Sequence, residues 1–214
     1  MKHIYVPFLY SDQPPINLSF TERWAKLPKN EVDIVNWPDF PYKPDVCFSM
    51  AHSNKGIYLK FWVAEEGIRG LVTEDNGNVF TDSCVELFID PSGDGNYYNF
   101  EFNCIGTLLL GYGTSRHHRE KASQEILDNV LRFSSLGAKQ IDHEGSFKWE
   151  LTAFIPFKAF FKHHLDSLAG KIIRANIQKC GDDMPVPHFI TWNEINTSKP
   201  DYHRPEFFGE LHFE

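Results

Sequence analysis

The sequence lacks a long apolar run, a block of basic residues and the common nucleotide-binding motifs, and each absence argues against a class of protein. No stretch approaches the roughly 20 apolar residues that a membrane-spanning helix needs. The formal net charge is −8, whereas nucleic-acid binding requires a basic stripe. There is no G-x-S-x-G elbow, no P-loop and no G-x-G-x-x-G motif after a strand. We therefore expect no membrane or nucleic-acid partner and no organic cofactor.

The N-terminal residues also lack the apolar stretch and the small-residue cleavage site of a signal peptide. This predicts a cytoplasmic protein, unless a leader has been removed, in which case an extracellular or periplasmic location follows. The four cysteines are widely spaced and form no C-x-x-C pair. Buried free thiols are the expectation, and a disulfide between Cys84 and Cys104 is the alternative.

Turn residues separate a long series of apolar segments, and this punctuation is typical of antiparallel sheets. Residues 53–56 (SNKG) and 91–95 (PSGDG) each lie between two such segments, as in β-hairpins. Further strands are predicted over residues 106–112, 147–155, 171–180 and 206–213. A short helix is predicted over 156–164, and residues 119–131 form either a short surface helix or a loop. The pattern predicts an all-β fold, a two-sheet antiparallel β-sandwich of immunoglobulin-like or jelly-roll-like architecture with one or two short helices.

The N-terminal part of the chain has a different character. Residues 36–44 are rich in proline and cannot form a central strand. We therefore interpret residues 1–44 as an N-terminal arm packed on the sandwich. With no linker-like change of composition, residues 1–214 are predicted to form a single domain.

Alternate residues of the predicted strands divide into an apolar face and a polar face. Sugars need paired hydrogen-bond donors and acceptors for their hydroxyls and an aromatic plane for their C–H face. The polar face offers both, which predicts a site for a mono- or oligosaccharide, with a solvated or loop-covered sheet face as the alternative. Its candidate ligand-binding residues are Glu86, Asn99, Glu101, Asn103, Arg174, Gln178 and Trp62.

Two further features stand near these strands. Trp192 precedes a proline-containing loop, where it either lies against a ligand or plugs the end of the sandwich. Asp90, Asp94 and Asn96 lie in an oxygen-rich loop punctuated by glycine, which has the look of a calcium site. A plain hairpin turn is the alternative for that loop.

The strand segments, taken in order, resemble family 9 carbohydrate-binding modules, which were first described as appendages of xylanases. The resemblance extends over residues 45–213, and its motifs are specific as an ordered set. They are residues 81–90 (TDSCVELFID), 97–103 (YYNFEFN) with Gly106, 149–156 (WELTAFIP), and Trp192 followed by 204–211 (RPEFFGEL).

The resemblance implies a β-sandwich that binds terminal sugars of plant polysaccharides such as xylan, with structural calcium. The sugar ring would lie between two aromatic side chains, with its hydroxyls held by charged and amide groups. By position, Trp192 matches one aromatic and Glu86 a hydroxyl-binding carboxylate. The second aromatic falls near Phe80, and Trp62 is the rival for that role.

Two other functions stay open at this point. Glu86 and Glu101 lie on neighbouring predicted strands, and glycoside hydrolysis uses two carboxyls about 5–9.5 Å apart. This allows a xylanase-like hydrolase or an accessory subunit of polysaccharide breakdown. A protein-interaction sandwich is the second alternative. Non-catalytic carbohydrate binding is the leading prediction, and we assign no catalytic residue.

Overall fold

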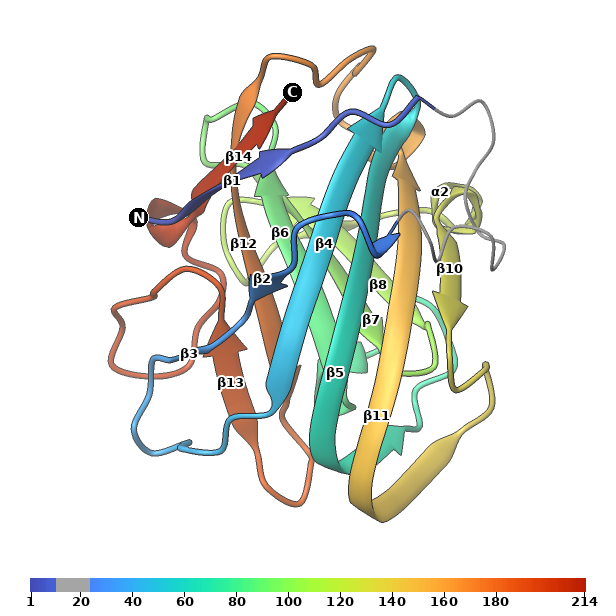
Figure 1. Cartoon of the computed structure of the whole chain (residues 1–214), viewed down its shortest axis with the longest axis vertical. Helices are drawn as coiled ribbons and strands as arrows, with labels where there is room; N and C mark the ends of the chain where they lie inside the picture. The colour runs from blue at the N-terminus through green and yellow to red at the C-terminus, as the bar shows by residue number, and fades with distance from the viewer. Residues whose placement is uncertain (11–23) are drawn as a thin grey trace.

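In a computed structural model, two β-sheets pack face to face (Figure 1). The structure describes residues 1–10 and 24–214. Within these residues, the smaller sheet has five strands in the order β10–β11–β5–β4–β2, and it lies in front in Figure 1. Their bounds are Leu131–Ser134, Ile141–Pro156, Gly56–Gly70, Asp45–Ser53 and Asn30–Glu31.

The larger sheet has nine strands in the described ranges and lies behind the smaller one in Figure 1. Its main path runs β1–β14–β12–β6–β7–β8–β9, and β13 pairs with both β12 and β3. In that order the bounds are His3–Val6, Gly209–Phe213, Ile172–Gly181, Cys84–Asp90, Tyr97–Asn103, Leu108–Gly113 and Glu120–Lys121, with β13 at His188–Thr191 and β3 at Ile34–Val35.

The core lies between the sheets and follows the alternation of the strands. Phe61 on β5, Leu87 on β6, Phe100 on β7 and Ile177 on β12 are all fully buried in one apolar cluster. Each is flanked along its strand by side chains on the opposite face. The predicted antiparallel sandwich and its two hairpins, β4–β5 and β6–β7, are confirmed.

The N-terminal segment is joined to both sheets by strand pairing, which the sequence did not predict. β1 runs parallel to β14, the C-terminal strand, so the first and last strands of the chain lie side by side, with the two chain ends at opposite ends of the pair (Figure 1). β2 pairs with β4 of the smaller sheet, and β3 pairs with β13 of the larger one. No strand lies in residues 36–44, as their proline content predicts.

The predicted helices are much shorter in the structure. Within residues 119–131 only Gln124–Asn129, α2, is helical, and it is bracketed by β9 and β10. Residues 156–164 contain a single 3-10 turn, η3, at Phe157–Ala159. Two further 3-10 turns are η2 at Val79–Thr81 and η4 at Pro205–Phe207. No helix in the described parts of the chain is long and apolar enough to cross a membrane.

All four cysteines are free thiols. The Cys84–Cys104 disulfide is wrong because the two residues lie on opposite faces of the larger sheet. The register pairs Cys84 with Asn103, not with Cys104. Cys104 points into the core, where its thiol donates to the Arg69 carbonyl at 3.2 Å.

Candidate functional site

A row of polar side chains crosses three neighbouring strands on the outer face of the larger sheet. The register places Gln178 on β12 opposite Glu86 on β6, and Glu86 opposite Glu101 on β7. All three side chains are buried, with exposures of 0%, 2% and 4%. The alternation that sends Leu87 and Phe100 to the core turns these residues to the other side.

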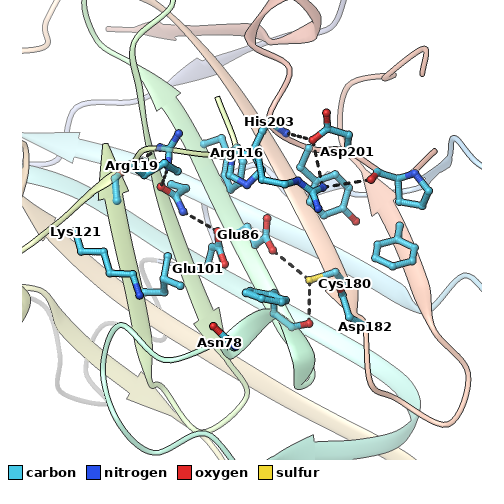
Figure 2. A pocket seen from close by; sticks show the side chains of 18 residues that line it. Asn78, Glu86, Glu101, Arg116, Arg119, Lys121, Cys180, Asp182, Asp201 and His203 are labelled. Carbon is cyan, nitrogen blue, oxygen red and sulfur yellow. Dashed lines mark hydrogen bonds and ion pairs between the residues drawn. The ribbon is translucent and has the colours of Figure 1, made fainter. Parts of the chain in front are cut away.

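The two glutamates form the floor of a cavity of about 470 Å³ (Figure 2). This volume falls within the roughly 300–1,000 Å³ typical of small-molecule sites. β6, β7, β8 and β12 supply the floor, and residues 116–121 and 200–203 contribute to the walls. The polar face is therefore hollowed, with loops forming part of its walls.

A relay of hydrogen bonds leads from an arginine to the floor. Arg119 Nε donates to Asn99 Oδ1 at 2.8 Å, and Asn99 Nδ2 donates to Glu101 Oε1 at 2.7 Å. The Arg119 guanidinium is held by the Tyr97 carbonyl at 2.8 Å and stacks on the Tyr97 ring at 4.4 Å. Gly111 leaves room for this relay, because a Cβ there would lie 2.8 Å from Asn99 Oδ1. The relay fixes the orientation of both Asn99 and Glu101.

The two carboxyl groups keep one oxygen each without a partner. Glu86 Oε2 and Glu101 Oε2 are buried and find no hydrogen bond among the described residues. Burial, and next the charge of Glu101, raises the pKa of Glu86 well above its ordinary value. Burial raises the pKa of Glu101 to about 7, although the hydrogen bond from Asn99 lowers it. Both groups therefore hold protons more readily than exposed glutamates do, and each can donate or accept a hydrogen bond.

The rim is closed by contacts between two loops. Arg116 Nη2 binds Asp201 Oδ1 at 3.2 Å and the Pro200 carbonyl at 3.3 Å (Figure 2). His203 Nδ1 lies 2.8 Å from the Tyr97 hydroxyl. Burial, together with the charge of the nearby arginines, lowers the pKa of His203 to about 3, so the ring is neutral. The rim thus combines an ion-paired arginine with a neutral imidazole.

Aromatic side chains supply the apolar part of the cavity. Phe80 and Phe189 line it and are both half-buried, so their rings remain accessible to a ligand. Phe88 and Tyr202 also line it but are almost fully buried. Phe189 is braced edge-on by Phe40, with ring centroids 4.9 Å apart. Rings held in this way can pack on the C–H face of a sugar.

Two thiols lie at one end of the floor. Cys180 Sγ is 3.1 Å from Glu86 Oε1, and Cys84 Sγ is 4.0 Å from the same oxygen. Burial raises the pKa of Cys84 to about 12 and that of Cys180 well above its ordinary value. As protonated thiols, neither is an activated nucleophile.

Trp192 does not reach this cavity. It is 2% exposed and lies in the core between the sheets, 6.2 Å edge-on from the Phe48 ring. Its indole fills the space above Gly209, where a Cβ would lie 2.6 Å from Trp192 Cζ3. Of the two roles left open for Trp192, the structure therefore supports the structural one.

Trp62 lies on the other side of the molecule. It belongs to β5, and its side chain faces outward from the smaller sheet, where Lys29 Nζ lies 4.1 Å over its ring. There it borders a second hollow of about 610 Å³ with Lys148 and Glu150. Alternation correctly predicts that Trp62 faces away from the core. It does not show whether the residue belongs to the outer face of the smaller or of the larger sheet.

Three other predicted residues lie on the correct face but do not line the cavity, and two of them hold the protein's own backbone in place. Arg174 donates to the Phe208 carbonyl at 2.5 and 3.0 Å and does not line the cavity. Asn103 Nδ2 binds Asp82 Oδ2 at 2.9 Å and the Val72 carbonyl at 2.8 Å, which fastens the loop before β6. Gln178 is completely buried beside Glu86, and both polar atoms of its side chain are unpartnered within the described residues.

The oxygen-rich loop is closed by its own backbone amides. Asp90 Oδ1 accepts from the amides of Ser92 and Gly93, and Oδ2 accepts from that of Gly95, at 2.8–3.1 Å. Asp94 Oδ1 accepts from the amide of Asn96 at 2.9 Å. In the described residues Asp90 and Asp94 belong to no cluster of three metal-ligating side chains. The geometry is that of a hairpin turn stapled by aspartates, so we carry the calcium prediction no further.

The sequence analysis missed the residues that come from loops. Arg116, Arg119, Asp182, Phe189 and Asp201 all line the cavity, yet none lies on the strand faces from which the site was predicted. Arg119 begins a segment that was predicted to be either a short helix or a loop. Strand alternation gives no information about loops, and the only available signal was the arginine-containing segment that directly follows β8.

The fold and the cavity define a ligand-binding β-sandwich. A family model, carbohydrate-binding family 9, matches residues 18–213, and the chain therefore belongs to this family. Non-catalytic carbohydrate binding is accordingly its function at the level of class, as the resemblance predicted. No curated protein sequence matches the chain.

Solved structures agree with this assignment. A protein from Bacteroides uniformis, described as a candidate carbohydrate-binding protein, is 41% identical, with a TM-score of 0.95 over 100% of this chain and 99% of its own. A family 9 module from Caldicellulosiruptor kristjanssonii has been solved with glucose and with cellotriose. At 16% identity it shares the fold, with TM-scores of 0.62 and 0.65 over 100% of this chain and 96% and 94% of its own.

Proposed function

We propose that the cavity floored by Glu86 and Glu101 is the carbohydrate-binding site of this protein. The observation that carries this proposal is the pair of buried, unpartnered oxygens Glu86 Oε2 and Glu101 Oε2. A buried polar atom without a partner costs about 1–3 kcal/mol, so a ligand that supplies hydrogen bonds removes this cost on binding. Sugar hydroxyls both donate and accept, which suits two carboxyls that readily hold protons.

The remaining groups suit the same ligand. Asn99 presents an oriented amide beside the carboxyls, while Phe80 and Phe189 offer apolar rings for the C–H face. The site is thus polar on its floor and aromatic at its wall, which is the division that a pyranose requires.

The charge of the cavity favours a neutral sugar. Its lining has four carboxylic side chains, Glu86, Glu101, Asp182 and Asp201, against the cations Arg116, Arg119 and Lys121. Both arginines are already engaged, Arg119 by Asn99 and backbone carbonyls and Arg116 by Asp201. No lining arginine is therefore left over for a sugar carboxylate, and acidic sugars would meet the buried glutamates.

Calorimetric titration of the full chain, in the presence of a chelator, tests the proposal. The panel is glucose, xylose, cellobiose, xylobiose and cellotriose, with glucuronate as the acidic comparison. We expect at least one neutral sugar to bind and glucuronate to bind more weakly. Phe80→Ala should weaken the best ligand by about 0.5–1.5 kcal/mol. The control Phe133→Ala, on the exposed edge strand β10, should leave affinity unchanged.

Absence of binding across the whole panel would contradict the proposal. So would equal effects of the two phenylalanine substitutions. Chromogenic glycosides of the same sugars should show no turnover. Hydrolysis that disappears in Glu86→Gln would instead favour the glycoside hydrolase alternative.

A further inference from the structure

Two strands place two thiols and a carboxylate at one point of the cavity floor. Cys84 and Glu86 are two residues apart on β6, so both face the same side of the sheet. Cys180 lies directly opposite Cys84 on β12. One sulfur from each cysteine and one oxygen of Glu86 lie within 4.8 Å of one another. In the described residues this is the one group of three His, Cys, Asp or Glu side chains so arranged.

The separations suit a small tetrahedral ion. With zinc–sulfur bonds of about 2.3 Å and zinc–oxygen bonds of about 2.1 Å, tetrahedral ligands lie roughly 3.6 Å apart. The observed distances to Glu86 Oε1 are 3.1 Å from Cys180 and 4.0 Å from Cys84, which lie on either side of that value. These two sulfur–oxygen distances therefore match tetrahedral coordination to within about half an ångström.

The surroundings of these three residues are polar groups that lack partners. Glu86 Oε2 is buried and unpartnered, and the Gln178 amide, next to Glu86 in register, has neither atom satisfied by the described part of the chain. Asp182 follows Cys180 by two residues and also lines the cavity (Figure 2). Buried groups of this kind are uncommon in folded proteins and mark places where an ion or ligand is expected.

We propose that Cys84, Cys180 and Glu86 form a binding site for a zinc ion. Two sulfurs and one carboxylate oxygen are a ligand set that zinc accepts, whereas calcium and magnesium require oxygen ligands alone. On binding, the ion takes the place of the two thiol protons and of the proton that Glu86 holds in its acid form, and these protons pass to solvent. Glu86 and Cys180 line the cavity, which provides the route of entry.

The proposed ion leaves a fourth position free. Three protein ligands with one open position are the arrangement of zinc sites that bind a further molecule, rather than of purely structural ones. Because Glu86 and Cys180 line the cavity, the open position lies on the cavity side, where water or a sugar hydroxyl would complete the tetrahedron. Zinc binding itself does not depend on the proposed sugar binding.

Titration of the reduced, metal-free full chain with Co²⁺, followed by displacement with Zn²⁺, tests this site. A phosphine reductant keeps the cysteines as thiols. We expect one cobalt per chain, with the intense visible bands of tetrahedral coordination and thiolate-to-cobalt charge transfer in the near ultraviolet. One equivalent of zinc should abolish both signals, and native mass spectrometry should show one zinc per chain.

Variants assign the ligands. Cys180→Ser should reduce the charge-transfer signal by about half, because Cys84 remains as one thiolate ligand, and should weaken binding at least tenfold. Glu86→Gln should weaken binding about tenfold with the signal kept. Cys47→Ser is the matched control, because Cys47 is a free thiol on β4 of the smaller sheet. It should bind cobalt as the unchanged protein does. Far-ultraviolet circular dichroism verifies that each variant is folded, and Cys84→Ala replaces Cys180→Ser if the latter is not.

Three results would overturn the proposal. The first is the absence of stoichiometric zinc or cobalt uptake at tens of micromolar metal. The second is a weak octahedral cobalt spectrum, and the third is equal uptake by Cys180→Ser and the unchanged protein. None of these measurements uses sugar. The sugar titration, in turn, is carried out with a chelator and therefore without bound metal. Failure of the zinc proposal can thus be distinguished from failure of the sugar proposal.

Discussion

Glu65 on β5 and Lys179 on β12 form an ion pair between the two sheets, with Lys179 Nζ 2.7 Å from Glu65 Oε2 and both side chains completely buried. Trp149 Nε1 donates to the other Glu65 oxygen at 2.7 Å. His188 Nε2 lies 2.6 Å from Lys179 Nζ, and burial lowers the pKa of His188 to about 3, so its neutral ring accepts this bond. Lys179 lies between Gln178 and Cys180 on β12. The Glu65–Lys179 ion pair therefore holds β12 in place directly behind the cavity floor.

Lys179→Met tests the energetic weight of this pair. Removing one partner leaves Glu65 buried without its cation, and such changes cost about 3–5 kcal/mol of unfolding free energy. Denaturant unfolding measures the loss. Lys139→Met, at an exposed position, should change stability by no more than about 0.5 kcal/mol. The double variant Glu65→Leu with Lys179→Met should recover most of the loss, and a single variant costing under about 1 kcal/mol would contradict this account.

Glu86→Gln tests the carboxyl at the centre of the cavity. The amide keeps the size of the side chain but replaces one carboxyl oxygen with an NH₂ group that can only donate, and a buried polar group left without a partner costs about 1–3 kcal/mol. We expect sugar affinity to fall roughly tenfold to a hundredfold, measured by calorimetry in a chelator. Glu144→Gln, at an exposed position on β11, is the control. Unchanged affinity in Glu86→Gln would exclude this carboxyl from the site.

The pH dependence of stability tests the environment of Glu101. Its pKa is raised by burial from 4.5 to about 7, so the folded state holds the proton to higher pH than the unfolded state does. Its contribution is therefore most favourable below about pH 4.5 and is lost as pH rises to about 7. His188 and His203, with lowered pKa values, act in the opposite direction between about pH 3 and 6.5.

For that reason the informative quantity is the difference between the unchanged protein and Glu101→Gln. The variant has no carboxyl to ionise at position 101. The unfolding free energy of the variant minus that of the unchanged protein should therefore increase as pH rises from 4.5 to 7. A difference that does not vary with pH, or one that varies in the opposite direction, would show that the pKa of Glu101 is not raised.

Gly111→Ala tests the relay from Arg119 through Asn99. The added Cβ would lie 2.8 Å from Asn99 Oδ1 and 3.3 Å from Arg119 Nε, so the amide must move. Because Asn99 orients Glu101, we expect a loss of sugar affinity of about tenfold. Gly113→Ala is a matched control on the same strand, where a Cβ meets its neighbours at an ordinary 3.5 Å. Equal affinities in the two variants would contradict the relay.

The sequence was informative wherever strand alternation decides the outcome. It predicted the two hairpins, the core positions and the outward direction of Glu86, Asn99 and Glu101, because a period of two depends only on local backbone geometry. The positions of Trp62 and Trp192 could not be obtained in this way. The way in which the two sheets associate decides which outer face a strand contributes to. It also decides whether an aromatic side chain at the edge of a loop turns inward.

The groups that complete the site come from long-range contacts. Arg119 acts through Asn99, twenty residues away, and Phe189 lines the cavity because β13 pairs with β12. The raised pKa of Glu101 arises from burial under loops that a sequence pattern does not place. Motif resemblance predicted the family and Glu86, but it placed the aromatic platform at Trp192, which the structure buries in the core.

The location of bound sugar is the most direct test of the central claim. Backbone amide shifts in ¹H–¹⁵N NMR spectra, recorded while the best sugar of the panel is titrated, report it without mutation. The account predicts that the largest changes fall on β6, β7 and residues 111–121 and 200–203, with β4 and β5 around Trp62 unaffected. Changes concentrated around Trp62 on the smaller sheet, with Glu86 and Glu101 unmoved, would contradict it.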